Sequence, residues 1–157
     1  MLIFEDVAGG RVELTFGPNR FGMPARHVLL LLKHDDKWLL TVHRTRGIEF
    51  PGGKAEDEET VEEALVRETF EETGVSVTNI KRFAEYIVEN DTKFCKAVFT
   101  GEVLTIHENP TLHETKGAVW LTDAELDACQ TLSFHMKGTG MEELRKWVDE
   151  HDGRWHD

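Results

Sequence analysis

A chain of 157 residues is long enough to bury a hydrophobic core, and we expect residues 1–157 to form one domain. Its 30 Asp and Glu residues against 18 Lys and Arg give a formal net charge of −12, which excludes a general nucleic-acid-binding surface, because such a surface would be basic. Residues 1–6 do not fit a signal peptide, and the apolar run at residues 28–32 is too short for a membrane span, so we expect a cytoplasmic protein without a membrane partner. Cys95 and Cys129 lack metal-ligand spacing and are expected to be reduced thiols.

Strand patterns dominate the first 50 residues. Apolar and polar residues alternate on both sides of Ala8-Gly9-Gly10, which is typical of a β-hairpin. A continuous apolar run then predicts a buried central strand, and Asp35-Asp36 predicts a turn into the next strand. Residues 44–50 are rich in bases and are predicted to form a loop. The predicted strands are residues 2–7, 11–16, 27–33 and 37–43.

Residues 53–75, GKAEDEETVEEALVRETFEETGV, hold nine acidic residues and only two bases. A charge run of this kind is usually a solvated face. The spacing argues against that interpretation, because residues three and four apart share one face of a helix, so that Glu68, Glu71 and Glu72 project from one patch. Neighbouring carboxylates repel one another unless a cation neutralises them, and hard divalent cations such as Mg2+ take oxygen ligands.

The same stretch carries the signals of a helix. Gly52 and Gly53 follow Pro51 and predict a tight loop before the helix, Asp57 is the expected N-cap, and Thr73-Gly74 fits a C-terminal stop. We expect Arg67 to lie between Glu63 and Glu71 in an i,i+4 ladder and to orient both. The predicted core side of this helix comprises Leu65, Val66, Thr69, Phe70 and Thr73.

Strand patterns return after this stretch. Residues 76–89 and 93–106 are predicted as two long strands joined at Asn90-Asp91, followed by a polar loop at residues 108–117 and a short strand at residues 118–121. Two further helices are predicted at residues 122–129, with Thr122 as the cap, and at residues 140–150. The second of these helices is amphipathic, with Met141, Leu144, Trp147 and Val148 facing inward. Strands interleaved with helices predict a mixed α/β layered domain.

The acidic stretch resembles the Nudix box. Gly53, Glu59, Arg67-Glu68, Glu71-Glu72 and Gly74-Val75 stand at the spacing of that motif, and every charged and glycine position is matched. Thr69 departs from it, because the family usually has a larger aliphatic residue there; this affects packing and leaves the carboxylates untouched. The motif covers 23 of the 157 residues. The resemblance implies a Nudix α/β/α sandwich with a mixed sheet over nearly the whole chain.

The same resemblance implies an activity, namely hydrolysis of a nucleoside diphosphate linked to another group. Mg2+, with Mn2+ as a substitute, would neutralise and align the phosphates and help to form hydroxide. By match to the motif, Glu71 and Glu72 are expected to bind the metal, and the carbonyl of Gly52 is a further candidate ligand. Glu68 is expected to act as a ligand or as the general base, and Arg67 to orient the carboxylates.

Candidates outside the box are weaker. Glu114, within the sequence HETKG, is the candidate for the remote carboxylate that many Nudix enzymes use as an extra ligand or base. His27 and His43 are expected to be ordinary strand residues. Four bases are candidates for contacts to substrate phosphates, although a solvated basic loop explains the arginines near the box equally well. These bases are Arg26, Arg44, Arg46 and Lys54.

Substrate class is suggested by residues around the box. The next proline, Pro110, comes too late for the ADP-ribose branch of the family. The segments EFPGGK and HETKG resemble the MutT-like nucleotide pyrophosphatases, among them the antimutator 8-oxo-dGTP diphosphatases of Gram-positive bacteria that also act as RNA 5′-pyrophosphohydrolases. The expected substrate is therefore a nucleoside triphosphate such as 8-oxo-dGTP or a 5′-triphosphate RNA end, bound without an extended nucleic-acid groove.

Two alternatives stay open. The chain fits a hydrolase of another nucleoside diphosphate derivative, such as an ADP-sugar, because the box itself does not select the substrate. It also fits a non-catalytic Nudix-fold regulator that binds nucleotides. Retention of Glu68, Glu71 and Glu72 argues against a regulator, since binding alone would not need all three carboxylates.

Overall fold

Two sheets organise the chain in a computed structural model that describes residues 1–6, 9–17, 21–137 and 139–151. The larger sheet has the order β1-β2-β8-β9-β3-β7, in which β3 runs parallel to β9 and every other pair is antiparallel. In the smaller sheet β5 pairs with β10, β4 and β6. The strands are β1 Leu2–Glu5, β2 Arg11–Phe16, β3 Ala25–Leu30, β4 Lys33–His34, β5 Lys37–His43, β6 Gly47–Glu49, β7 Gly52–Lys54, β8 Val75–Glu89, β9 Lys93–Ile106 and β10 Thr115–Leu121.

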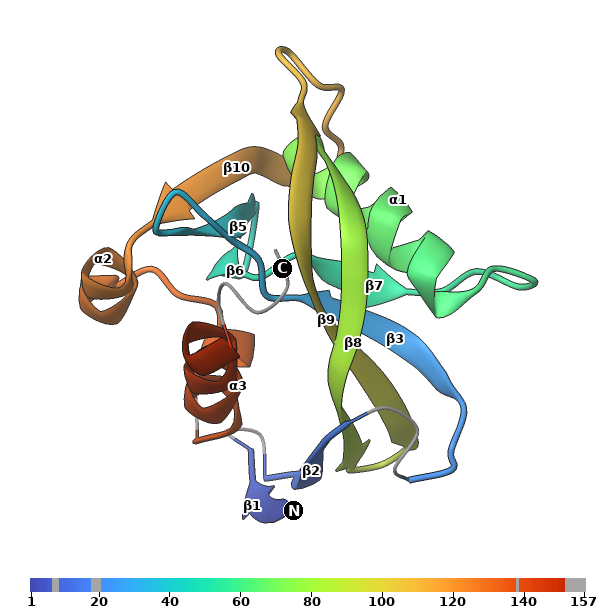
Figure 1. Cartoon of the computed structure of the whole chain (residues 1–157). Helices are drawn as coiled ribbons and strands as arrows, with labels where there is room; N and C mark the ends of the chain where they lie inside the picture. Colours follow the sequence, from blue (N-terminus) through green and yellow to red (C-terminus); the bar gives the residue numbers. More distant parts are fainter. Residues whose placement is uncertain (7–8, 18–20, 138, 152–157) are drawn as a thin grey trace.

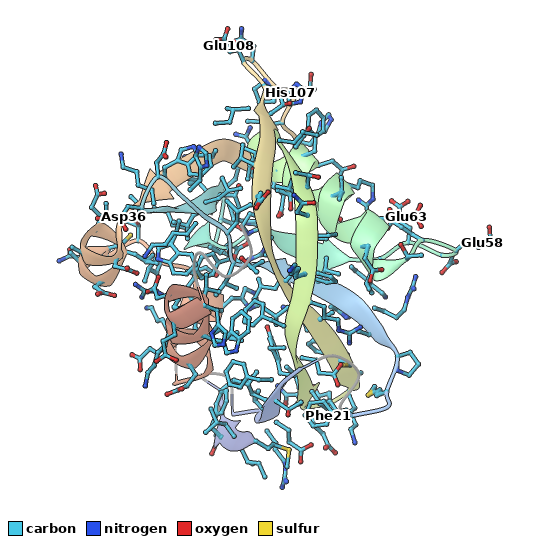
Figure 2. The ribbon with its side chains drawn as sticks, in the orientation of Figure 1. Phe21, Asp36, Glu58, Glu63, His107 and Glu108 are labelled. Carbon is cyan, nitrogen blue, oxygen red and sulfur yellow. The ribbon has the colours of Figure 1, made fainter. Side chains whose placement is uncertain are left out.

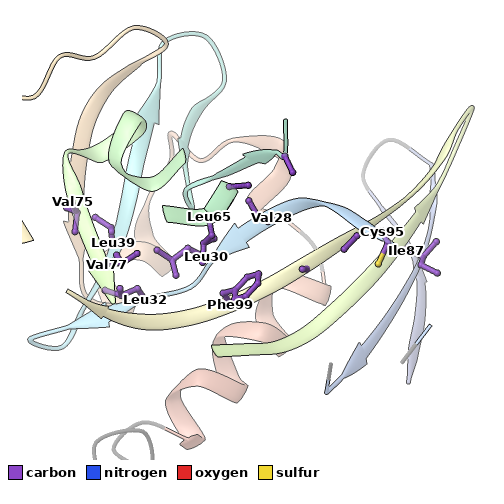
Figure 3. Packing of buried hydrophobic residues seen from close by; sticks show 14 residues of the cluster. Val28, Leu30, Leu32, Leu39, Leu65, Val75, Val77, Ile87, Cys95 and Phe99 are labelled. Carbon is purple, nitrogen blue, oxygen red and sulfur yellow. The ribbon is translucent and has the colours of Figure 1, made fainter. Parts of the chain in front are cut away.

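Helices cover the two sides of these strands (Figure 1). On one side, Val28, Leu30 and Leu32 pack in a cluster that includes Leu65 of α1 (Figure 3). On the other side, Leu29 and Leu31 pack with residues of α2 and α3. The continuous apolar run is explained by this alternation, because both faces of a central strand are buried. The helices are α1 Val61–Thr73, α2 Asp123–Ala128 and α3 Thr139–His151, with a short 3-10 turn, η1, at Phe134–Met136.

The predicted α/β class with a mixed sheet is confirmed, as are most element positions. Strand β5 spans the predicted residues 37–43, and β8 and β9 form the predicted long pair. Strands β1 and β2 form the predicted hairpin, although residues 7–8 of its connection lie outside the described residues. Among the described helices, none is both long and apolar enough to cross a membrane.

The start of α1 differs from the prediction. Its N-cap is Thr60 rather than Asp57, because Thr60 and Glu63 form a reciprocal capping box: the Thr60 side chain accepts from the Glu63 amide, and the Glu63 carboxylate accepts from the Thr60 amide. Glu58 lies in the loop that precedes the helix and Glu63 in its first turn, on the side away from the sheets (Figure 2). The C-terminal stop is confirmed, since Gly74 adopts a left-handed conformation with φ of 77°.

The core side of α1 is narrower than predicted. Leu65, Thr69 and Thr73 are buried, but Val66 and Phe70 are about two-fifths exposed, at 38% and 41%. The helix contacts the strands along one stripe only, and these two side chains lie at its margin. The ring of Phe70 instead contacts that of His107 edge-on, at 5.0 Å between centroids.

Three predicted loops are partly strand. Residues 47–49, 52–54 and 115–117 belong to β6, β7 and β10 rather than to loops. Strand β6 pairs with β5, which directly precedes it, whereas β7 and β10 pair with β3 and β5, which are distant in sequence, so local composition did not reveal these two. The strand assignment matters for function, because β7 lies directly before α1 and beside its carboxylates.

One carboxylate links strands β4 and β5 of the smaller sheet to helix α3. Asp123, at the start of α2, accepts hydrogen bonds from Lys33, from the Trp38 indole and from Arg145. Burial by itself would raise the pKa of Asp123, but the hydrogen bonds from these donors prevail, so that its pKa is lowered to about 2. The lowered pKa means that the ionised form stabilises the folded protein.

We expect Asp123→Asn to lower the free energy of unfolding by about 1 kcal/mol at pH 7, a figure reduced for solvent screening because the side chain is 43% exposed. Stability from a lowered pKa is present above the unfolded value of 3.8 and is lost as pH falls toward 2. The free energies of unfolding of wild type and variant, measured by urea titration, should therefore become equal as the pH falls from 4 to about 2. Asp35→Asn, at a side chain 90% exposed, is the control; an equal loss there would refute this role of Asp123.

Candidate active site

The site is built where β7 meets α1. Gly52 and Gly53 pair with Leu29 and Val28 of β3, which fixes them beside the helix. A Cβ on Gly52 would lie 2.3 Å from the Val28 carbonyl oxygen, and one on Gly53 would lie 2.5 Å from the carboxyl carbon of Glu68. Glycine at position 52 is therefore required by the close approach of the β3 backbone, and glycine at position 53 leaves the space that the Glu68 carboxyl group occupies.

Glu72 is the most perturbed carboxylate of the site. Its Oε1 accepts a hydrogen bond of 3.0 Å from the amide of Gly52, and its backbone carbonyl accepts from the hydroxyls of Thr41 and Thr115. Burial raises the pKa of Glu72 to about 8; the Gly52 amide opposes this shift, whereas the charge of Glu68 adds to it. A carboxylate held in this way is a strong potential ligand for a cation, because a cation would restore its charged form.

Glu68 and Glu71 lie on the same face of α1. Glu68 is half-buried, and burial raises its pKa while the hydrogen bond from Arg67 opposes the shift. Glu71 is more exposed, with 53% of its side chain accessible. The predicted patch of three carboxylates is thus present on one helix face, with Gly52 and Gly53 beside it.

Arg67 holds this patch in place. Its Nε and Nη2 form a two-pronged pair with Glu59 at 2.7 and 2.9 Å, and its Nη1 donates to Glu68 at 2.9 Å and to Glu71 at 3.1 Å. The predicted link to Glu63 is wrong, because the Glu63 carboxylate caps the helix instead. The pKa of Arg67 is raised by its bond to Glu59, so this residue stays charged and orients carboxylates.

The donor set fits a hard divalent cation. Carboxylate oxygens and the Gly52 carbonyl are the oxygen ligands that Mg2+ and Mn2+ prefer. Within the described ranges, no three acidic, imidazole or thiol groups are already close enough to hold an ion together. Glu68 and Glu71 face Arg67 and Glu72 faces the Gly52 amide, so binding would require these side chains to turn toward the ion.

Glu114 lies near the patch although it is distant in sequence. It directly precedes Thr115, whose hydroxyl donates to the Glu72 carbonyl at 2.6 Å. Its backbone carbonyl accepts from the amide of Arg44, and its charge contributes to the raised pKa of Glu68. Its side chain is exposed. The structure therefore brings Glu114 together with the box carboxylates.

The predicted substrate arginines are engaged within the protein. Arg26 donates to the carbonyls of Glu56 and Glu59, which secures the segment before α1. Arg44 donates from its side chain to the carbonyl of His113. Arg46 forms an ion pair of 2.7 Å with Glu49. Lys54 is exposed at the end of β7, where its backbone carbonyl accepts from Arg67.

A cavity of about 150 Å3 adjoins Gly52 and Gly53. Its lining includes three residues that the sequence did not single out, Glu49, Lys96 and His135. Glu49 is buried; desolvation raises its pKa, but hydrogen bonds from Arg46 and Ser133 prevail and lower it. The sequence signal for these residues was weak, because they come from β6, β9 and η1 and meet only in the folded chain.

Comparisons with known proteins agree with this geometry. The chain is 36% identical over 140 residues to Bacillus subtilis YtkD, provisionally named an 8-oxo-dGTP diphosphatase, covering 87% of this chain and 89% of that protein. It is similar in structure to a mutant of the B. subtilis pyrophosphohydrolase BsRppH, with a TM-score of 0.89, 32% identity and coverage of 98% and 99%. A NUDIX hydrolase from Nitrosomonas europaea shares the fold, with a TM-score of 0.67, 24% identity and coverage of 83% and 90%.

The NUDIX domain model matches residues 23–150, which include the whole carboxylate site and both of its supporting glycines. The chain therefore belongs to the Nudix hydrolase family.

Proposed function

We propose that this Nudix pyrophosphohydrolase acts on nucleoside triphosphates, with 8-oxo-dGTP and 5′-triphosphate RNA ends as substrates and Mg2+ as its cation. The observation that carries the proposal is the close approach of Glu68 to Gly53 and the hydrogen bond from the Gly52 amide to Glu72, beside a cavity. The similarity to YtkD and to BsRppH, each over most of both chains, supports the substrate class.

Each side chain has a proposed part in the hydrolysis. Glu71, Glu72 and the Gly52 carbonyl bind the cation, which when bound neutralises phosphate charge and lowers the pKa of water. Glu68 is a further ligand or accepts the proton of the attacking water, and Arg67 fixes its orientation. Glu114 is the second candidate for that proton. A water oxygen bonds to phosphorus while an anhydride P–O bond breaks, leaving pyrophosphate and a monophosphate.

The test is a product assay with 8-oxo-dGTP, dGTP, triphosphorylated RNA and ADP-ribose, each with Mg2+, with Mn2+ and with a chelator. We expect pyrophosphate to be released from the triphosphates in the presence of either cation, and no turnover with the chelator. A preference for ADP-ribose over all triphosphates would overturn the proposed substrate class.

RNA length should have little effect on the rate. The chain is acidic overall, so contacts are expected with only the first one or two nucleotides rather than with a basic groove. Steady-state kinetics on triphosphorylated RNAs, from a dinucleotide to a long chain, should give similar kcat/KM values. A large gain with length that disappears at high salt would contradict binding at the end alone, while leaving the hydrolase assignment intact.

A further inference from the structure

A second cavity lies next to the one beside the glycines. The first, here the glycine cavity, is the space of about 150 Å3 bounded by Gly52 and Gly53. The second, here the apolar cavity, is a larger space of about 250 Å3. Both are lined by Tyr86, Lys96 and His135, so the two spaces adjoin. The apolar lining of the second includes Phe4, Val12, Leu14, Val88, Phe94 and Leu144.

Lys96 stands at the junction of the two cavities. Its ammonium nitrogen lies 5.5 Å from the centre of the Tyr86 ring, and no carboxylate in the described part of the chain forms an ion pair with it. After desolvation, the charge of Lys96 is the next largest cause of the lowered pKa of His135, which lines both cavities, and of the lowered pKa of His27. Arg26, Arg44 and Arg46, by contrast, are engaged by protein oxygens.

The chemistry of the two cavities differs in the way that the two halves of a nucleotide differ. The glycine cavity adjoins the carboxylates and, through a bound cation, suits phosphate oxygens. Most of the residues lining the apolar cavity are hydrophobic or aromatic, as in a small-molecule pocket, and Asp6, Asn90 and Lys137 add polar groups to it. Aromatic side chains provide stacking surfaces for nucleobases, and a lysine ammonium binds phosphate as a point charge.

We propose that the two cavities form one nucleotide site, in which the apolar cavity holds the nucleoside and Lys96 contacts the phosphate that joins it to the reacting anhydride. The inference rests on the proposed function and adds to it a specificity-determining residue. Lys96 distinguishes a nucleotide from a free base, and the apolar cavity distinguishes a nucleotide from a base-free polyphosphate.

Calorimetric titration of the full chain with dGMP tests the site without requiring turnover. Lys96→Met removes the charge and keeps an apolar side chain, and it should weaken dGMP binding about tenfold, as expected for loss of one charge-assisted contact. Lys93→Met, an exposed position on the same strand, is the matched control and should leave the Kd unchanged. Lys96→Arg should restore part of the affinity, because the cation is retained.

Filling the apolar cavity with a larger side chain tests whether this cavity holds the nucleoside. Val88→Phe places a larger side chain in the lining and should weaken dGMP binding about tenfold. The inhibition constant of inorganic tripolyphosphate, measured against dGTP hydrolysis, should stay unchanged. Leu104→Phe, at a side chain 66% exposed on β9, controls for the added ring. Thermal melts identify any variant that fails to fold, in which case Lys96→Met still decides the proposal.

Two results would overturn the inference. One is equal dGMP affinity in Lys96→Met and Lys93→Met; the other is a folded Val88→Phe protein that binds dGMP normally or loses tripolyphosphate equally. Failure of the proposed function gives a different result, namely no hydrolysis of any triphosphate by the wild type, and it leaves the dGMP titration interpretable.

Discussion

Glu68→Gln, Glu71→Gln and Glu72→Gln should each lower kcat/KM on a nucleoside triphosphate by at least about 100-fold, the effect expected for loss of a cation ligand or of a general base. Each substitution keeps the size of the side chain and removes one carboxyl group from the patch beside Gly52 and Gly53. Steady-state kinetics with saturating Mg2+ measures the effect. Titration with Mn2+ followed by electron paramagnetic resonance would separate lost cation binding from lost proton transfer.

The three variants should remain folded. Glu72→Gln should keep or raise the melting temperature of the metal-free protein at pH 7, because burial disfavours the charged carboxylate and raises its pKa to about 8. Glu62→Gln, at an exposed position on the same helix, is the matched control and should be fully active. Near-normal activity of all three patch variants would show that the catalytic carboxylates lie elsewhere.

Local sequence patterns were sufficient to predict the strands whose side chains follow a regular pattern of buried and exposed positions. The alternation in β1 and β2 and the apolar run of β3 predicted strands correctly, because side chains alternate across a sheet. The start of α1 was missed because Asp57 and Thr60 are both good caps, and the reciprocal bond with Glu63 decides between them. A stricter test for the Thr-x-x-Glu capping box would have found it.

Strand β7 could not be predicted from composition. Gly52 and Gly53 have little preference for a strand, and they pair because β3 offers its edge to them. That pairing is also what places the two glycines against Glu68 and Glu72. A functional feature of the site therefore depends on a contact between segments more than 20 residues apart in sequence.

The carboxylates of the site could be predicted better than its basic side chains. Glu68, Glu71 and Glu72 lie on one helix, so helical spacing alone places them together. Arg44, Arg46 and Lys54 were candidates because they flank the site in sequence, and Arg26 because it opens a strand. Backbone carbonyls and Glu49 nevertheless engage the three arginines. Lys96 comes from β9, and only the sheet brings it to the same cavity as Gly52.

Arg67→Ala should lower both activity and stability, because Arg67 is the one residue that contacts Glu59, Glu68 and Glu71 together among the described ion pairs. Without it, Glu68 and Glu71 lose their fixed orientation, and we expect kcat to fall about 10- to 100-fold with a smaller change in KM. The loss of the two-pronged bond to Glu59 should lower the melting temperature by roughly 5 °C. Steady-state kinetics and thermal melts measure the two effects.

Arg67→Lys separates orientation from charge. Lysine retains the positive charge but lacks the planar fork that meets Glu59 through two nitrogens while Nη1 reaches Glu68. We therefore expect partial recovery of the melting temperature and little recovery of kcat. Arg11→Ala, which removes a surface arginine 58% exposed in its pair with Glu13, should change neither quantity. Full activity and unchanged stability of Arg67→Ala would exclude the orienting role, whereas full rescue by lysine would show that charge alone is what the carboxylates require.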